Sequence, residues 1–177
     1  MADGQKSLYK RGADDGFYFG IYLVVLFFAT AYSMILPFAG LLSLLMMLAV
    51  PVIIYRFLYK AFANSVRRLT FSELWLQGIV TFFCGGLIAG LVALIYMRWV
   101  NPAFITQQAQ TAIELWKSAE VQQANEMADL MTKAIEQKLL PTPIQVVMEM
   151  LWLQVFSGSI LSIVLSLIIR SIKMKSK

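Results

Sequence analysis

The sequence contains no histidine and only one cysteine, Cys84, which stands within an apolar run. Without histidine the chain cannot build an imidazole metal site or a histidine-based catalytic triad, and a single cysteine excludes an internal disulfide. Cys84 is expected to behave as a small buried apolar residue. The sequence also lacks a Gly-rich phosphate loop and a nucleophile motif, so it predicts no catalytic residue, no metal site and no cofactor.

Charged residues are scarce: they make up 14% of the 177 residues, whereas 59% are apolar. A soluble domain has about 25% charged and about 45–50% apolar residues, so this composition predicts a membrane protein. The length leaves room for one helical bundle and one small polar module. The net charge of +5 sometimes indicates nucleic acid. Here the basic residues gather beside the apolar runs, which favours membrane lipids as partners and no nucleic acid.

Four apolar runs predict an all-α, polytopic membrane protein with four transmembrane helices, three within residues 17–100 and the fourth within 144–170. The first run, from Phe17 to Leu36, has no charge and can cross a hydrocarbon core of about 30 Å. An alternative is a cleavable signal peptide, because a basic start and Ala29-Thr-Ala31 imitate one. The run continues past Ala31 and acids precede it, which favours a transmembrane helix.

Prolines and one capping motif predict the helix boundaries. Residues 37–40 (Pro-Phe-Ala-Gly) predict a tight turn between the first two helices. Pro51 lies inside the second helix, where it frees the carbonyl of Met47 and predicts a kink. Thr70-Phe-Ser-Glu73 has the form of a capping box and predicts the start of the third helix.

Small residues recur at four-residue spacing in the third and fourth helices, where they let another helix approach closely. The partner helix can belong to the same chain or to a second copy, so a homo-oligomer is an open interpretation. The predicted helix-packing residues are Gly86, Gly90, Gly158, Ser162 and Ser166.

Some polar side chains stand in or beside the membrane runs, where a transport pathway or proton relay would need them. A structural role competes, because Glu73 can cap a helix, Glu149 can reach water and the others can bond between helices. These candidates are Glu73, Gln77, Thr81, Glu149 and Gln154.

Lysine and arginine cluster in the mixed-charge N-terminal tail (1–16), which we expect to be loosely ordered, in the stretch 56–68, and at the C-terminal end with its basic tail (171–177). The positive-inside bias therefore places both termini in the cytoplasm and residues 101–143 outside. The residues expected to contact lipid headgroups are Arg56, Lys60, Arg67, Arg68, Arg170 and Lys173.

Residues 101–143 form the one long polar segment, and good helix formers dominate it. A single helix of about 36 residues would be about 54 Å long, which would carry the fourth helix away from the third, although packed helices lie about 8–10 Å apart. We therefore predict an extracytoplasmic, amphipathic helical hairpin with a break within 117–123. Its Met and Trp residues are expected to form the seam between the two helices.

Two passages resemble a known family: Arg68-Leu-Thr-Phe-Ser-Glu-Leu-Trp-Leu-Gln-Gly78 and Tyr96-Met-Arg-Trp-Val-Asn-Pro102. They resemble an uncharacterised family of small four-helix bacterial membrane proteins, known only as a domain of unknown function. The likeness in layout covers roughly residues 15–170. The resemblance implies a bacterial inner (cytoplasmic) membrane protein with an amphipathic insert after the third helix, and it supplies no activity, cofactor or catalytic residue.

Together these features favour a non-enzymatic accessory or scaffold subunit that binds a membrane or periplasmic protein through the outer insert or the small-residue helix faces. The alternative is a small oligomeric transporter or channel subunit. A polar track joining the intramembrane candidates would favour transport, whereas an exposed apolar patch on the insert would favour partner binding.

Overall fold

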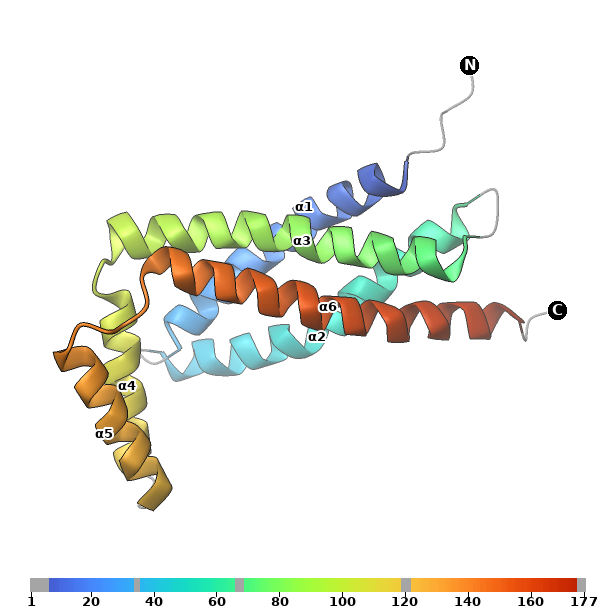
Figure 1. The fold of residues 1–177 in the computed structure, drawn as a ribbon. Coiled ribbons are helices and arrows are strands. Elements are labelled where there is room, and N and C mark those ends of the chain that lie inside the picture. Colours follow the sequence, from blue (N-terminus) through green and yellow to red (C-terminus); the bar gives the residue numbers. More distant parts are fainter. Residues whose placement is uncertain (1–6, 34–35, 66–68, 119–121, 175–177) are drawn as a thin grey trace. The chain divides into compact units, whose positions relative to one another are not determined.

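The computed structural model describes residues 7–33, 36–65, 69–118 and 122–174, and every regular element in these ranges is helical (Figure 1). Four helical stretches are long and apolar enough to cross a membrane, as the sequence predicts: Leu8–Ala31, Phe38–Ala63, Phe71–Val100 and Pro143–Ser171. The elements in chain order are α1 (Leu8–Ala31), α2 (Pro37–Ala63), α3 (Phe71–Ile95), the π-helix η1 (Tyr96–Val100), α4 (Phe104–Ser118), α5 (Gln122–Glu136) and α6 (Pro143–Met174).

The chain divides into two compact units, which are treated separately below. The bundle unit comprises Met1–Leu91 and Met150–Lys177, and the hairpin unit comprises Val92–Glu149. The bundle unit therefore holds α1, α2, most of α3 and most of α6. The hairpin unit holds α4 and α5 together with the adjoining ends of α3 and α6.

The first helix begins at Leu8, so the predicted loosely ordered tail over 1–16 is corrected from that residue onward. Ser7 starts the helix, because its hydroxyl accepts a hydrogen bond from the Lys10 amide at 3.3 Å. The turns that follow are held by packing, since Gly12 and Gly16 are buried. A carbon added at Gly12 would lie 2.8 Å from Val80 of α3.

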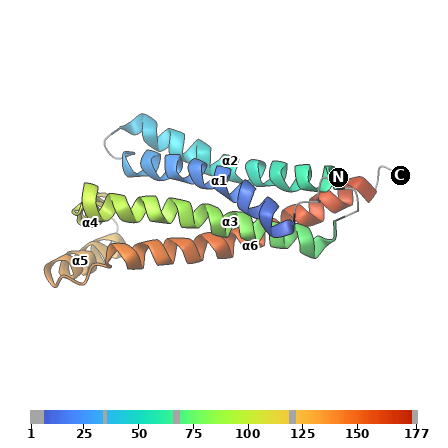
Figure 2. The same ribbon diagram turned by 90° about the horizontal axis from the view of Figure 1, so that it is seen from above.

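The second helix begins at Pro37, so the predicted tight turn over residues 37–40 is also corrected. Proline suits the first helical position because its missing N–H would have no partner there. Helix α2 continues through Pro51, and its ribbon changes direction near the middle (Figures 1 and 2). The Tyr22 hydroxyl of α1 donates a hydrogen bond to the Met46 carbonyl, next to the carbonyl of Met47 that Pro51 leaves without its helical donor.

A capping box starts α3, and a side-chain cap from Gln145 starts α6. At α3 the Thr70 amide donates to Glu73 Oε2 at 2.8 Å, and the Glu73 amide donates back to the Thr70 hydroxyl at 3.3 Å. This pairing confirms the predicted capping box. At α6 the Thr142 amide donates to Gln145 Oε1 at 2.8 Å. This cap was not predicted, because the surrounding prolines were interpreted only as helix stops.

Helix α3 packs against α1 on one side and α6 on another, and Figure 2 shows α1 beside α2 and α3 beside α6. Phe19 of α1 meets Phe82 of α3 edge to face, with ring centroids 5.1 Å apart. The core around this pair is completed by α2 and α6. Its buried members are Phe19, Ile54, Leu58, Ala61, Leu69, Leu74, Phe82, Leu165 and Ile169.

The core occupies one end of the bundle unit. The buried residues of α1 lie in its first half, and those of α2 and α6 lie toward the C-terminal ends of those helices. In contrast, no described side chain in 21–53 or 150–157 is buried. Tyr22, Leu23, Val50 and Ile53 pack against the edge of the core, and the exposed apolar side chains of those stretches are left to contact lipid.

We predict that Gly16→Ala lowers the free energy of unfolding by about 1–3 kcal/mol, the usual cost of overpacking. The added carbon would lie 2.6 Å from Cβ of Cys84 and 3.1 Å from the Thr81 carbonyl oxygen. Unfolding by a denaturing detergent measures the loss. Adding Cys84→Gly should recover part of it, because that change removes the nearest obstructing atom.

Gly40→Ala is the matched control, because its added carbon would meet Ser33 at 3.6 Å, an ordinary contact. This variant should be at least as stable to the detergent as the wild type, because alanine also has the higher helix propensity. An equal loss for both glycine variants would refute close packing at Gly16 as the cause, because the carbon added at Gly40 meets no close neighbour.

Candidate functional site

The side of α3 that faces α1 carries an interhelical polar contact. Gln77 is only 1% exposed, and its Nε2 donates a hydrogen bond to Asp15 Oδ2 at 2.9 Å. The Thr81 hydroxyl lies 2.9 Å from the Gln77 carbonyl and 3.3 Å from the Gly12 carbonyl, positioned to donate to either. The predicted polar residues Gln77 and Thr81 thus both lie where α3 meets α1, and each is placed to bond to a group of α1.

Asp15 was missed as a candidate because the sequence analysis assigned it to the tail. A signal was present in the sequence: Gly12, Gly16 and Gly20 repeat every fourth residue on either side of it. The same spacing in α3 and α6 was taken as a packing face. Applied to α1, it would have extended the first helix and placed Asp15 beside a membrane helix.

Glu73 lies at the start of α3. Its carboxylate accepts hydrogen bonds from the Thr70 amide and, at 3.0 Å, from the Thr70 hydroxyl. A carboxylate in the first turn also faces the positive end of the helix dipole. Capping therefore accounts for the presence of an acid here.

The contact between α3 and α6 uses three of the predicted small residues, Gly86, Gly158 and Ser162, together with Gly78 and Phe82, which were not predicted. Gly158 faces the ring of Phe82, and Ser162 faces Gly78, so neither glycine can take a side chain without displacing its neighbour. The Ser162 hydroxyl is fully buried and donates to the Gly158 carbonyl at 2.7 Å. Gly86 packs on Leu151 and Gln154. These contacts bring α3 and α6 of the same chain together.

The remaining predicted residues take no part in the hydrogen bonds described above. Two of them are exposed to some degree, and the other two each hold a buried polar atom. Gly90 is partly exposed, and Glu149 is exposed on the first turns of α6 in the hairpin unit. Ser166 is fully buried, and its hydroxyl, like the buried Nε2 of Gln154, has no hydrogen-bond partner in the structure. Gln77 and Thr81 face α1, whereas Gln154 faces Gly86 from α6. The described hydrogen bonds do not join these groups into one track.

The predicted headgroup cations are exposed where their side chains are described. Arg56 and Lys60 project from the last turns of α2, and Arg170 projects from the last turns of α6. Lys173 also lies on α6. Arg67 and Arg68 lie outside the described residues.

The polar insert forms two packed helices, α4 and α5, separated at the predicted break. Helix α4 ends at Ser118 and α5 begins at Gln122, while residues 119–121 lie outside the described residues. The helices meet through alanines, Ala109 at 8% and Ala128 at 0% exposure. Small side chains here let the two helix axes come close.

Backbone hydrogen bonds fix both ends of the hairpin. The Asn101 amide donates to the Tyr96 carbonyl at 2.8 Å and ends η1, and the Asn101 side-chain amide donates to Gln107 of α4 at 3.0 Å. At the other end Lys138 has a φ of 54°. The Leu139 amide then reaches back to the Ala134 carbonyl at 2.8 Å. This is a Schellman termination, which normally uses glycine at the Lys138 position.

One side of the hairpin exposes large apolar side chains. Leu115 of α4 is 59% exposed, and Met127 and Leu130 of α5 are 54% and 61% exposed. At about 100° per residue, Leu115 is rotated away from the buried Ala109 of α4. Met127 and Leu130 are rotated in the same direction away from the buried Ala128 of α5. In an antiparallel pair these three residues therefore share one side, which we term the apolar side.

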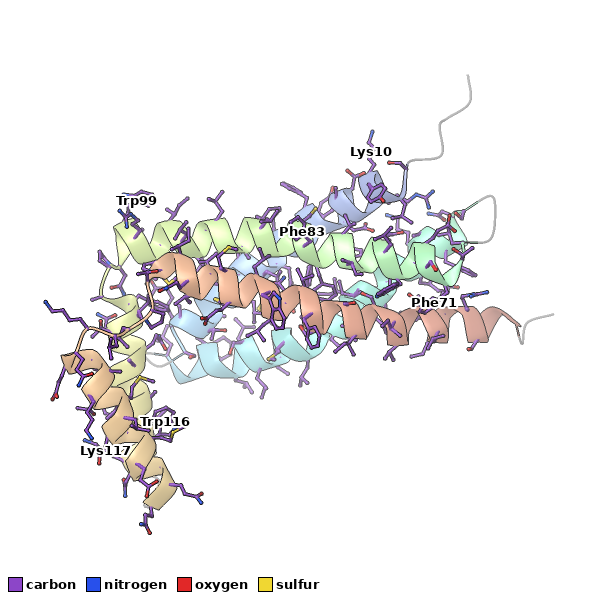
Figure 3. All side chains as sticks on the ribbon, viewed as in Figure 1. Lys10, Phe71, Phe83, Trp99, Trp116 and Lys117 are labelled. Atoms are coloured by element: carbon purple, nitrogen blue, oxygen red, sulfur yellow. The ribbon has the colours of Figure 1, made fainter. Side chains whose placement is uncertain are left out.

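The prediction that the Met and Trp residues form the hairpin seam is thus only partly right. Trp116 is partly buried on α4, next to the exposed Lys117 (Figure 3). Met127, in contrast, faces outward. The apolar residues of α5 spread over a wider part of its surface than α4 can cover. The sequence pattern does not indicate which of these residues α4 covers.

Titratable groups do not gather into a metal site: within the described ranges, no group of three or more Cys, Asp or Glu side chains could hold an ion. The features of this chain are instead four spanning helices, interhelical polar contacts and one amphipathic hairpin. These define a small multi-pass membrane protein.

The chain belongs to the family described as "Protein of unknown function (DUF4199)", which matches residues 14–171. This confirms the predicted membership in a family of unknown function. No curated protein and no solved structure matches the chain. The family assigns no activity, so the function has to be argued from the geometry.

We predict that Glu73→Gln leaves stability unchanged, whereas Glu73→Ala costs about 1 kcal/mol. Glutamine can accept the same bond from the Thr70 amide, and alanine cannot. Detergent-induced unfolding of the purified variants measures the difference. A loss of stability in Glu73→Gln as large as in Glu73→Ala would show that the charge, and not the cap, is required.

Proposed function

We propose that this protein is a non-enzymatic accessory or scaffold subunit of the bacterial inner membrane, and that its hairpin binds a partner protein. The observation that carries this proposal is the apolar side of the hairpin, formed by Leu115, Met127 and Leu130. Burying one such side chain contributes about 1.5–3 kcal/mol. Three of them on one side can anchor an interface.

The opposite sides of the two helices are polar. On α5, Asn125, Asp129 and Glu136 lie opposite Met127 and Leu130. An apolar centre bordered by polar residues is the usual form of a protein interface. The mixture of acidic and basic side chains gives the hairpin no strong attraction for an anionic surface, which favours a protein over the membrane as its partner.

The proposed location rests on charge. Lysine and arginine concentrate near the chain termini and in 56–68, so the positive-inside bias supports cytoplasmic termini. The hairpin joins α3 to α6 and would then face the periplasm. Its partner would be a periplasmic protein or the outer part of another membrane protein.

A transporter or channel subunit is the second candidate, and two observations favour it. The bond between Gln77 and Asp15 lies within the predicted spans. The buried Nε2 of Gln154 has no partner. Polar groups inside membrane helices often mark an ion pathway. The lack of a continuous polar track among the described residues makes this the weaker proposal.

Site-specific photo-crosslinking in cells tests the proposed function. A benzophenone amino acid replaces Leu115, Met127 or Leu130 in separate variants, and Lys117, Asn125 or Glu136 in the controls. The apolar-side variants should share one protein adduct of the same mass, because they face one partner. The controls should lack it, because they lie on the opposite sides of α4 and α5.

A combined Leu115→Ser and Leu130→Ser change should then remove the adduct formed from position 127, since it deletes most of the apolar contact. Adducts with lipid alone would refute partner binding. Adducts only with a second copy of the chain would show that the apolar side joins two copies of this protein, and would refute binding of a different partner protein.

A further inference from the structure

The last turns of α2 hold two cations on the side of the helix that points away from the core. Arg56 and Lys60 are exposed and one turn apart. Ile54, Leu58 and Ala61 are buried, with 1%, 1% and 8% exposure. At about 100° per residue the cations and these core residues lie on opposite sides of α2.

Neither cation is neutralised by another residue in the described part of the chain. Among the described residues, no ion pair and no hydrogen bond involves the side chain of Arg56 or Lys60. Helix α2 itself contains no Asp or Glu. By comparison, Arg11 of α1 lies 3.5 Å from the Ser65 hydroxyl just beyond α2. Two exposed cations without a described partner on the outer side of a spanning helix are available to counter-charges from outside the chain.

Two tyrosines flank these cations on the same helix. The rings of Tyr55 and Tyr59 stack with centroids 5.8 Å apart and an interplanar angle of 19°. Tyr59 is 41% exposed. Tyrosine concentrates at the level of the lipid headgroups, because its ring is apolar and its hydroxyl is polar. The pair therefore places Arg56 and Lys60 at that level.

We propose that Arg56 and Lys60, flanked by Tyr55 and Tyr59, bind the phosphate of an anionic phospholipid in the leaflet at the C-terminal end of α2. Charge complementarity selects this ligand, and the apolar helix on which the cations stand places lipid next to them. The Arg56 guanidinium can donate two parallel hydrogen bonds to phosphate, and Lys60 adds a mobile point charge. This proposal does not depend on the proposed function, which concerns the hairpin unit.

Native mass spectrometry tests the proposal on the full-length protein in detergent, with phosphatidylglycerol and phosphatidylcholine as the two probes. The wild type should bind phosphatidylglycerol more tightly than phosphatidylcholine. The double variant R56Q/K60Q should bind phosphatidylglycerol roughly 10- to 30-fold more weakly, the scale expected for two cations near an anionic surface. Its affinity for phosphatidylcholine should not change.

The variant K117Q/K133Q is the matched control, because it removes the same charge from exposed positions of the hairpin unit. It should keep the wild-type preference. An equal loss in both double variants would show an effect of net charge and overturn the proposal, as would unchanged binding in R56Q/K60Q. Thermal unfolding in phosphatidylcholine nanodiscs verifies that R56Q/K60Q is folded, and added phosphatidylglycerol should raise its midpoint less than that of the wild type.

Discussion

The close approach of neighbouring backbones on two sides of α3 is the constraint on which the bundle unit depends. Apolar side chains gain little by leaving lipid for another helix, so membrane helices associate through packing and hydrogen bonds. Gly16 and Gly85 provide this packing toward α1, and Gly78 and Gly158 provide it toward α6. The bond from Gln77 to Asp15 adds a polar contact where α1 and α3 are already close.

Local features of the fold were predictable from the sequence. The spanning helices follow from the length of the apolar runs, and the start of α3 follows from the Thr70 and Glu73 capping box. The start of α1 was not predicted, because the charges of residues 8–16 suggested a tail. That segment is helical because Gly12 and Gly16 pack against a helix more than sixty residues away in sequence, as Gly12 does on Val80. The packing of these glycines on α3 is a tertiary contact, and the sequence of residues 8–16 alone does not show it.

The candidate sites show the same division. Helical periodicity indicates which residues of α5 are apolar, but it does not indicate which of them α4 covers, so Met127 was misplaced and Ala128 was overlooked. Likewise, the sequence lists Gln77 and Gln154 as equivalent intramembrane amides. In the structure one has a bonding partner from α1 and the other does not. Pairing across helices is a property of the folded chain.

The core lies at one end of the bundle unit, so the side chains are packed more closely at that end than at the other. Where Phe19, Leu58 and Leu165 are buried together, separating the helices would expose closely packed side chains. Along 21–53 and 150–157 no described side chain is buried, and the helices meet there through partly exposed groups, such as the hydrogen bond from Tyr22 to the Met46 carbonyl and the packing of Gly86 on Leu151. Substitutions where the core lies would therefore disturb more buried packing than substitutions within 21–53.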